Sequence, residues 1–327
     1  AIFNKGNGID SGQVRIYTWN ETAWVQKGID IDGEAASDES GSSVSMPDAN
    51  TIAIGARVND GNGNASGHTR IFSWNGTAWV QKGIDIDGEA ANDLSGVSVS
   101  MPDANTVAIG APYNNGNGPI IGQVRIYKWN GSTWVQKGID IEGEAADDQS
   151  GFSVSMPDAN TVAIGTRFNN GNGFHAGQVR IYKWNGSGWV QYGLDIDAET
   201  DSDNSGGGVT RQNAKTDAVG APFNNGNGSL AGQVRVFNVS STLNIDDFYP
   251  EDAALKLFPN PVSELLNINL GDNQTPDGFQ IYDLNGRMVL QGGEGLNSIN
   301  VSGLSKGLYL IKIKTDKQML QAKFIKK

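Results

Sequence analysis

Short apolar segments alternate with polar turns over about the first 240 residues, and none of them has the period of an amphipathic helix. The segments "FSVSM" (152–156), "TVAIG" (161–165), "QVRIYKW" (178–184) and "WVQYG" (189–193) have the length and composition of strands. "PDAN" separates the first two, and an Asn-Gly turn, a strong hairpin signal, separates the last two. We therefore predict four antiparallel strands here.

This four-strand pattern recurs every 55 residues and stops near Val239. Equivalent residues recur at this spacing, for example Trp19, Trp74, Trp129 and Trp184, and Gly55, Gly110, Gly165 and Gly220. Four copies without an insertion indicate units that stack on one another. An all-β fold of four-stranded β-propeller blades fits best, with a β-solenoid as the alternative.

The motifs "SGFSVSMPDANTVAIG" (150–165) and "GAP" (110–112 and 220–222) resemble the FG-GAP repeat of integrin-type β-propellers. The resemblance covers roughly residues 1–240 and implies a seven-blade ring. The family often carries an Asp-x-Asp-x-Asp-Gly calcium loop where this chain has "PDAN", so that calcium site does not carry over. Because Ala1 falls in mid-unit and third strands outnumber first strands, we expect an incomplete ring whose missing blades precede residue 1.

Strand alternation assigns the loops to two faces. The "PDAN" and "WNG" turns should share one face, and the loops after strands two and four should share the other. The loop after strand two contains "YNNGNG" (113–118) or a close variant in each copy. Asn and Gly tolerate positive φ, so a plain turn explains this motif. The alternative is a ligand-face loop, with candidate residues Asn114, Asn115, Asn117, Asn169, Asn170 and Asn172.

The loop after strand four is acidic, as in "DIDGEAASDES" (30–40), and the four such loops hold more than half of the chain's 36 Asp and Glu residues. Hard cations such as Ca²⁺ take oxygen ligands of this kind, whereas a solvated acidic rim is the plainer interpretation. The candidate metal ligands are Asp30, Asp32, Glu34, Asp85, Asp87, Glu89, Asp140, Glu142, Glu144, Asp195 and Asp197.

All eight tryptophans occupy the third–fourth strand hairpins, two per copy. They could stack on sugars, but we expect them to pack blade against blade. The net charge of −12 disfavours nucleic acid and anionic membranes as partners, and the absence of cysteine excludes thiolate chemistry. The two histidines, His68 and His175, are not shared between copies, and we give them no role. A catalytic constellation needs unlike groups brought together once, so we do not expect an enzyme.

The composition changes after residue 254. "LFPNPV" (257–262), "YDLNGR" (282–287), "GLYLIKI" (307–313) and "KFIKK" (323–327) resemble the C-terminal sorting domain of type IX secretion in Bacteroidota. The residues that carry the resemblance are Pro259, Asn260, Pro261, Asp283, Asn285, Gly286, Gly307 and Tyr309. The resemblance implies a small Ig-like β-sandwich, export through the outer-membrane translocon, recognition by a shuttle protein and removal by a sortase. A sandwich without a targeting role is the alternative.

We therefore expect a propeller-like array (1–240), a linker (241–254) and a sorting domain (255–327). The predicted function is binding or adhesion to a glycan or protein at the cell surface or outside the cell. The alternatives are a passive structural array and an accessory propeller of an enzyme encoded upstream.

Overall fold

The computed structural model describes the chain except residues 214–215, 239–254, 271–275, 284–286, 294–297 and 316–318. The chain divides into two compact units, Ala1–Thr242 and Leu243–Lys327. The expected linker (241–254) lies wholly outside the described residues. In the described part, every regular element is a strand, and no helix is long and apolar enough to cross a membrane.

Unit 1 contains three complete antiparallel sheets in which strands one to four follow in order and a short fifth strand pairs with the start of the third. The first sheet comprises β5 (Ser40–Asp48), β6 (Thr51–Ala56), β7 (His68–Trp74), β8 (Trp79–Gln81) and β9 (Ile86–Asp87). The second comprises β10 (Ser98–Asp103), β11 (Thr106–Ala111), β12 (Gln123–Trp129), β13 (Trp134–Gln136) and β14 (Ile141–Glu142). The third comprises β15 (Ser150–Asp158), β16 (Thr161–Thr166), β17 (Gln178–Trp184), β18 (Trp189–Gln191) and β19 (Ile196–Asp197).

The four predicted strands per repeat are confirmed, but the short fifth strand lies where the sequence suggested only an acidic loop. In β9, Ile86 is buried and pairs with Thr69, while Asp87 pairs with His68. One apolar residue among the carboxylates is enough to hold the loop against the third strand, because its burial stabilises the pairing by about 1.5–3 kcal/mol.

Partial sheets stand at the two ends of the array. At the amino end, β1 (Gln13–Val14) pairs with β4 (Ile31–Asp32), and β2 (Tyr17–Trp19) pairs with β3 (Trp24–Gln26). At the other end, β20 (Gly208–Asn213), β21 (Thr216–Ala221) and β22 (Gln233–Asn238) form a three-stranded sheet.

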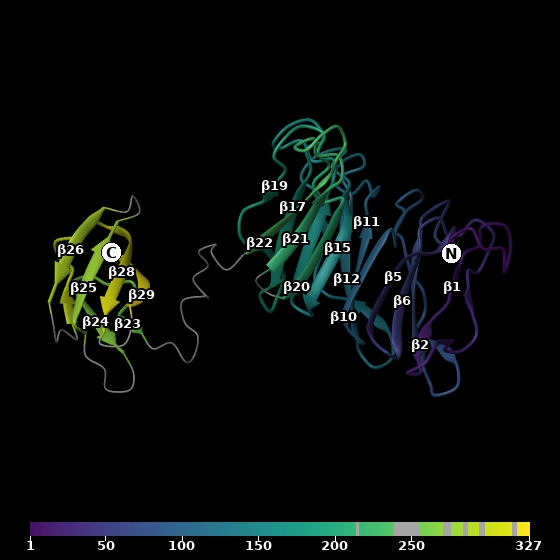
Figure 1. Ribbon diagram of the computed structural model, residues 1–327, viewed down its shortest axis with the longest axis horizontal. Coiled ribbons are helices and arrows are strands. Elements are labelled where there is room, and N and C mark those ends of the chain that lie inside the picture. The colour runs from purple at the N-terminus through teal and green to yellow at the C-terminus, as the bar shows by residue number, and fades with distance from the viewer. Residues whose placement is uncertain (214–215, 239–254, 271–275, 284–286, 294–297, 316–318) are drawn as a thin grey trace. The chain divides into compact units, whose positions relative to one another are not determined.

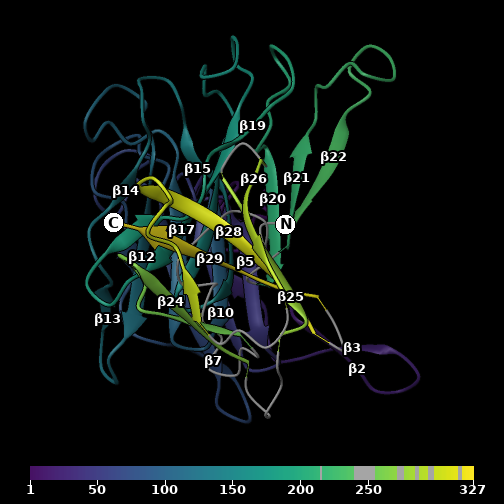
Figure 2. The same cartoon turned by 90° about the vertical axis from the view of Figure 1, so that its left-hand side faces the viewer.

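The sheets of unit 1 form an open array. Figure 1 shows them side by side in chain order, with β2 and β22 at opposite ends. Figure 2 looks along the array, so that the sheets lie one behind another. No described strand of the amino-terminal end pairs with β20, β21 or β22, so the described residues form no closed ring. The all-β fold is confirmed, whereas the incomplete propeller ring stays a prediction.

The core of unit 1 lies between consecutive sheets. Every residue of β6, β11 and β16 is buried, because a neighbouring sheet covers each face of these strands. One apolar cluster, for example, joins Ala108 and Ile126 of the second sheet to Val154, Met156 and Ile164 of the third. The apolar character of "TVAIG" on both faces follows directly from this stacking.

The first strands of consecutive sheets contact each other through serine hydroxyls. The Ser45 hydroxyl accepts a hydrogen bond from the Met101 backbone N–H at 2.9 Å, and the Ser43 hydroxyl donates to the Gly96 carbonyl at 2.7 Å. The same pair of bonds recurs at the next two interfaces. Small hydroxyl side chains are required here because the strands approach closely at the inner edge.

The tryptophan pairs connect each repeat to the repeat before it. The Trp79 indole Nε1–H donates to the Lys27 carbonyl at 2.7 Å, and the Lys27 ammonium lies 5.1 and 5.2 Å from the Trp74 and Trp79 rings. The same arrangement links Lys82 to Trp134 and Lys137 to Trp189. The prediction that the tryptophans pack repeat against repeat is confirmed.

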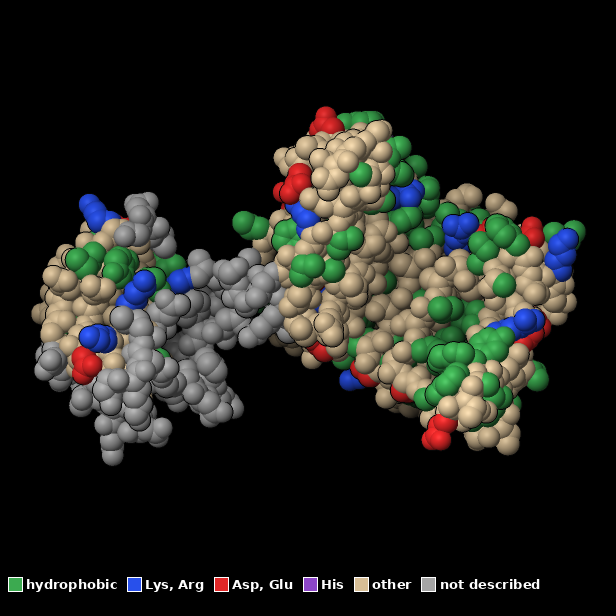
Figure 3. Space-filling view, viewed as in Figure 1, with side chains coloured by type: hydrophobic (Ala, Val, Ile, Leu, Met, Phe, Trp, Pro, Cys, Tyr) green, Lys and Arg blue, Asp and Glu red, His purple; other side chains and the backbone are tan. Residues whose placement is uncertain are grey.

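The first tryptophan pair has no described repeat before it. Trp19 and Trp24 are 53% and 68% exposed, and Tyr17 and Val25 beside them are also exposed. Figure 3 shows hydrophobic side chains gathered over this end, where Figure 1 places β2.

In the last sheet an ion pair replaces an apolar contact. Arg211 and Asp217 stand where the preceding copy has Met156 and Val162, and both side chains are fully buried with 2.7 Å between Nη1 and Oδ2. The fourth copy therefore differs from the preceding copy in the interior of its sheet.

Unit 2 is a β-sandwich, as predicted. One sheet contains β23 (Lys256–Phe258), β24 (Leu265–Asn269) and β27 (Ser298–Asn300). The other contains β25 (Gly278–Tyr282), β26 (Met288–Gly292), β28 (Gly307–Lys314) and β29 (Met319–Lys326). A single apolar core includes residues of both sheets, among them Leu266, Ile281, Ile311 and Phe324.

Replacing Trp79 should destabilise the array far more than replacing Trp24. W79A removes a buried indole and its hydrogen bond to Lys27, so we expect a loss of about 3–5 kcal/mol in the free energy of unfolding. W24A removes the equivalent but exposed ring, and we expect a loss of about 1 kcal/mol or less. Urea unfolding of both variants checks this, and equal losses would show that the pairs stabilise only their own hairpins.

Candidate functional site

The two kinds of loop expected on one face do lie together, and we call this the loop face. The Asn62 side-chain amide donates to the Gly88 carbonyl at 2.9 Å, which joins an Asn-Gly loop to the next acidic loop. On the other face, the Trp74 N–H donates to the Asn50 carbonyl at 2.8 Å, which joins a "PDAN" turn to a "WNG" hairpin. The predicted division of the loops is confirmed.

The six asparagines proposed as ligand-face residues make hydrogen bonds within the loops. Asn114 is buried, accepts from the Gly116 N–H at 2.7 Å and donates to Asp93 at 2.9 Å. Asn115 accepts from the Ile120 N–H. The other asparagines are bonded in the same way. Asn169 donates to Asp148, Asn117 donates to Glu142, Asn172 donates to the Ala198 carbonyl, and Asn170 accepts from the His175 N–H. These internal hydrogen bonds explain the motif as a turn. A ligand would have to compete with them for the asparagine side chains, and ligand contact by these residues stays a prediction.

The candidate metal ligands do not gather in one pocket but are distributed over successive sheets. Several pair with side chains nearby: Asp30 with Arg15 and Gln26, Asp32 with Gln13, Asp85 with Gln81, Asp140 with Gln136, Asp195 with Gln191, and Glu142 with Asn117. The hydrogen bond and charge of Arg15 lower the pKa of Asp30. Burial raises the pKa of Asp87 and of Asp197, and Asp85 and Asp195 beside them raise it further.

Where two sheets meet on the loop face, a carboxylate of one repeat reaches a glutamine of the next. Gln123 donates from Nε2 to Glu89 at 2.7 Å, and Arg125 Nη1 lies 3.7 Å from the same carboxylate. Gln178 and Glu144 repeat the arrangement at 2.8 Å, with Arg180 in place of Arg125. We call these two places the glutamine junctions, defined by Glu89, Gln123 and Asp140 and by Glu144, Gln178 and Asp195.

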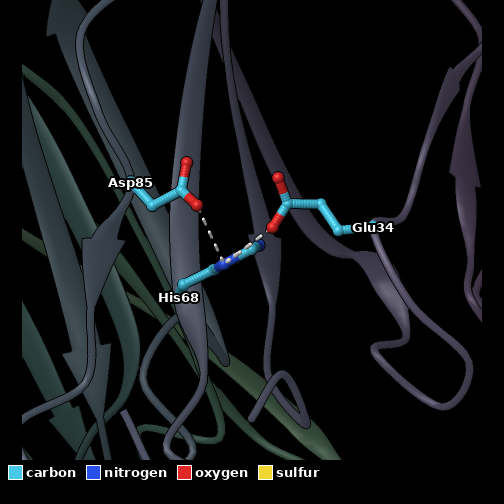
Figure 4. A group of neighbouring side chains, drawn as sticks. All are labelled: Glu34, His68 and Asp85. Carbon is cyan, nitrogen blue, oxygen red and sulfur yellow. Dashed lines mark ion pairs between the residues drawn. The ribbon is translucent and has the colours of Figure 1, made fainter. Parts of the chain in front are cut away.

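The junction between the first two repeats is different, because His68 stands at the glutamine position. Its Nδ1 lies 3.8 Å from Glu34 Oε2 and 3.8 Å from Asp85 Oδ2. Figure 4 shows both carboxylates directed at this nitrogen. We call the set Glu34, His68 and Asp85 the histidine junction. Among the described residues it is the one group of three metal-ligating side chains whose ligand atoms all lie within 4.8 Å of one another.

His68, to which the sequence analysis gave no role, is a buried residue of β7. Its side chain is 1% exposed, and its Nε2 is buried without a hydrogen-bond partner among the described residues. The start of the third strand lies under the acidic loop of the preceding repeat, which a strand-by-strand interpretation of the sequence could not show. The available signal was the replacement of Gln by His at one position of a repeat.

Burial keeps the His68 ring neutral at neutral pH. Burial, with the nearby positive charge of Arg70, lowers the pKa of His68 to about 4, against the opposite effect of Asp85 and Asp38. Burial raises the pKa of Glu34 despite Arg70, and the neighbouring carboxylates Asp85, Asp38 and Asp87 raise it further. The junction therefore combines an uncharged imidazole with an excess of carboxylates.

In unit 2 a motif residue joins the first part of the domain to its last strand. The Asn260 side chain accepts from the Ile325 N–H at 2.8 Å, between Pro259 and Pro261, so the "PNP" segment closes onto the last strand. Tyr309 stacks on Phe324 with 5.6 Å between ring centroids.

The remaining motif residues lie in and next to the four-stranded sheet. Asp283 accepts from Arg287, and Gly307 begins β28. Asn285 and Gly286, the predicted hairpin turn, lie outside the described residues.

Residues 256–327 match the family described as the secretion system C-terminal sorting domain. This domain indicates export by type IX secretion across the outer membrane to the cell surface or the extracellular space, and interaction with the type IX machinery. No curated protein sequence matches the chain.

Two solved structures are similar to the chain at low identity. PorZ, a surface component of the type IX secretion system of Porphyromonas gingivalis, is 12% identical with a TM-score of 0.40, over 96% of this chain and 42% of that one. The extracellular domain of the putative one-component system BT4673 from B. thetaiotaomicron is 10% identical with a TM-score of 0.28, over 84% and 34%. The chain thus spans less than half the length of either.

Substituting glutamine for His68 should remove an acid-sensitive contribution to stability. The pKa of histidine is about 6.5 in an unfolded chain and is depressed in the folded state, so the contribution is complete above pH 6.5 and is lost as the pH falls toward 4. Between pH 6.5 and 4.5, in the presence of a chelator, wild type should lose roughly 2 kcal/mol more than H68Q.

Urea unfolding at these two pH values measures this difference. The same charged groups, Glu34, Asp85, Asp38, Asp87 and Arg70, surround the position in both proteins, so H68Q is a matched control for the imidazole. Identical pH dependence in the two proteins would contradict the buried neutral imidazole.

Removing residues 255–327 should abolish export without unfolding the array. The two units are separately compact, and the sorting family matches only the second. In a host with type IX secretion, the truncated protein should accumulate in the periplasm in a protease-resistant form, as cell fractionation followed by limited proteolysis would show. Normal surface display of the truncated protein would refute the sorting role.

Proposed function

We propose that the array is the binding module of an exported surface protein and captures an extended glycan or protein through repeated contacts rather than catalysing a reaction. The order of motifs within each repeat further supports a relationship to FG-GAP propellers. In this proposal the sorting domain is recognised by the translocon and shuttle and is then removed by the sortase, so that the array acts outside the cell.

The observation that carries the proposal is a row of aliphatic side chains that no sheet covers. Ile29, Ile84, Ile139 and Leu194 follow the fourth strand of successive repeats and are 80%, 79%, 83% and 86% exposed. We call these four residues the outer row. Packing does not explain them, because the neighbouring Ile31, Ile86 and Ile141 are the ones buried in the sheets. The fourth copy exchanges the adjacent Lys for Tyr192 and still keeps an aliphatic residue in the row.

A groove between two neighbouring hairpins extends this surface. The groove between the second and third sheets has a volume of about 630 Å³ and is lined by Trp129, Val135, Lys137 and Trp184 among others. The outer-strand valines of three successive repeats, Val80, Val135 and Val190, are about half exposed. The first three repeats therefore carry the same combination of aliphatic, aromatic and basic residues at these positions.

The spacing of the repeats suits a ligand that is itself repetitive. Stacked sheets lie about 10 Å apart, so a chain of sugar residues or an extended polypeptide could contact several copies at once. Weak individual contacts then combine, because after the first contact the others form within the same complex.

A passive structural array is the second candidate, and the loop face favours it. The asparagines of the Asn-Gly loops are occupied by internal hydrogen bonds, as expected for loops that only join strands. The two candidates differ in what they predict for the outer row.

Removing two members of the outer row should weaken binding without affecting the fold. The double variant I84S/I139S removes two exposed aliphatic side chains, and we expect about tenfold weaker binding at an unchanged melting temperature. Biolayer interferometry against surface glycans and surface proteins extracted from the producing bacterium measures this.

Phe174→Ser is the matched control, because it removes a 64% exposed apolar side chain from the loop face. The control should bind like wild type. If the wild-type array binds neither extract, or if the double variant binds as well as wild type, the outer row is not a binding surface and the structural array is favoured.

A further inference from the structure

The histidine junction differs from the glutamine junctions in its unmet hydrogen bonds. In the glutamine junctions, an amide N–H of Gln123 or Gln178 closes the gap to the carboxylate at 2.7 or 2.8 Å. In the histidine junction neither ring nitrogen of His68 has a hydrogen-bond partner among the described residues, although the side chain is 99% buried. Burying a polar ring in this way costs free energy that these contacts do not recover.

The distances between His68 Nδ1 and the two carboxylates are close to those in a metal site. Tetrahedral zinc sites have metal–ligand distances of about 2.0–2.2 Å, which places their ligand atoms about 3.4 Å apart. Here Nδ1 of His68 lies 3.8 Å from one oxygen of each carboxylate, and all three atoms lie within 4.8 Å of one another. Glu34 and Asp85 are partly exposed, so small side-chain rotations could bring them onto an ion.

The neighbouring charges also favour a bound cation. Arg70 Nη1 lies 3.5 Å from Glu34 Oε1, which leaves the other oxygen, Oε2, directed at His68. Arg70 Nη2 also donates to the Asp32 carbonyl at 2.7 Å, so its guanidinium is fixed in place. Carboxylates still outnumber cations at the junction, because Asp38 and Asp87 act on Glu34 as well.

We propose that Glu34, His68 and Asp85 bind one divalent transition-metal ion, with Zn²⁺ as the best match. One imidazole and two carboxylates suit Zn²⁺ or Co²⁺, whereas Ca²⁺ prefers six to eight oxygen ligands. Three protein ligands leave a position open to water or to a donor group of a ligand.

The ion would also join two repeats. Glu34 belongs to the acidic loop of the first copy, whereas His68 and Asp85 belong to the second. Metal binding should therefore raise the melting temperature of the array, since the ion binds only when the two copies are stacked.

The experiment is a titration of the full chain with Co²⁺, using untagged, chelator-treated protein. The sequence contains only two histidines, and His175 is stacked between Phe168 and Phe174, so background binding by imidazole is small. We expect one Co²⁺ per chain by visible absorption, displacement by one equivalent of Zn²⁺, and no displacement by excess Ca²⁺.

Two variants give the matched controls. H68Q converts the site into a glutamine junction of a kind the protein already contains, and it should keep the fold while weakening Co²⁺ binding by at least about tenfold. Q123H places a histidine between Glu89 and Asp140, the counterparts of Glu34 and Asp85, and should add a second Co²⁺ site.

The proposal is overturned if wild type binds no Co²⁺, if H68Q binds it as tightly as wild type, or if Ca²⁺ displaces Co²⁺ as effectively as Zn²⁺ does. A folded Q123H with only one site would also contradict the assignment. None of these results depends on whether the outer row binds a glycan or a protein.

Discussion

The close approach of glycine backbones between consecutive sheets is the constraint on which the array depends. Gly55 lies against the carbonyl of Gly96, Gly110 against Gly151, and Gly165 against Gly206. A Cβ at Gly55, Gly110 or Gly165 would overlap that carbonyl, so the spacing of the sheets at the inner edge permits only glycine. The glycines that supply these carbonyls, Gly96, Gly151 and Gly206, are therefore packing positions. The hydroxyls of Ser43, Ser98 and Ser153 donate hydrogen bonds to the same carbonyls.

Stacking at this distance explains both the apolar interior and the polar loop face. The second strand of each sheet is covered twice and becomes wholly buried. At the loop face, the same stacking places the acidic loop of one copy over the third strand of the next, where Gln or His and Arg must satisfy its carboxylates. With Gln at this position, the side chain donates a hydrogen bond to the carboxylate. With His, the ring nitrogen lies 3.8 Å from two carboxylate oxygens and makes no hydrogen bond to either.

The outer edge is under no such constraint. The second, third and fourth tryptophan pairs contact the preceding copy through a hydrogen bond and cation–π contacts, whereas the outer row is exposed. The interior of the array thus follows from stacking, and the chemistry available to partners outside the cell is concentrated at the outer edge and at the loop face.

Much of this protein could be predicted from its sequence because the relevant information is local and repeated. The 55-residue step, the apolar second strand, the Asn-Gly hairpins and the ordered motifs of the sorting domain each depend on residues close together in the chain. They determined the four strands per repeat, the two loop faces, the packing role of the tryptophans and the route of export. The fifth short strand was missed because a single buried isoleucine within an acidic run gives no periodic signal.

Only the tertiary structure decided how neighbouring copies meet. His68 is separated from Glu34 by 34 residues and lies in a different sheet, so burial under the preceding acidic loop is visible only once the sheets are stacked. The same holds for the outer row, because Ile29 and Ile31 have the same local sequence character and opposite exposure. Periodicity along the chain shows which residues recur, but the distance between sheets decides which of them face a neighbouring sheet and which face the solvent.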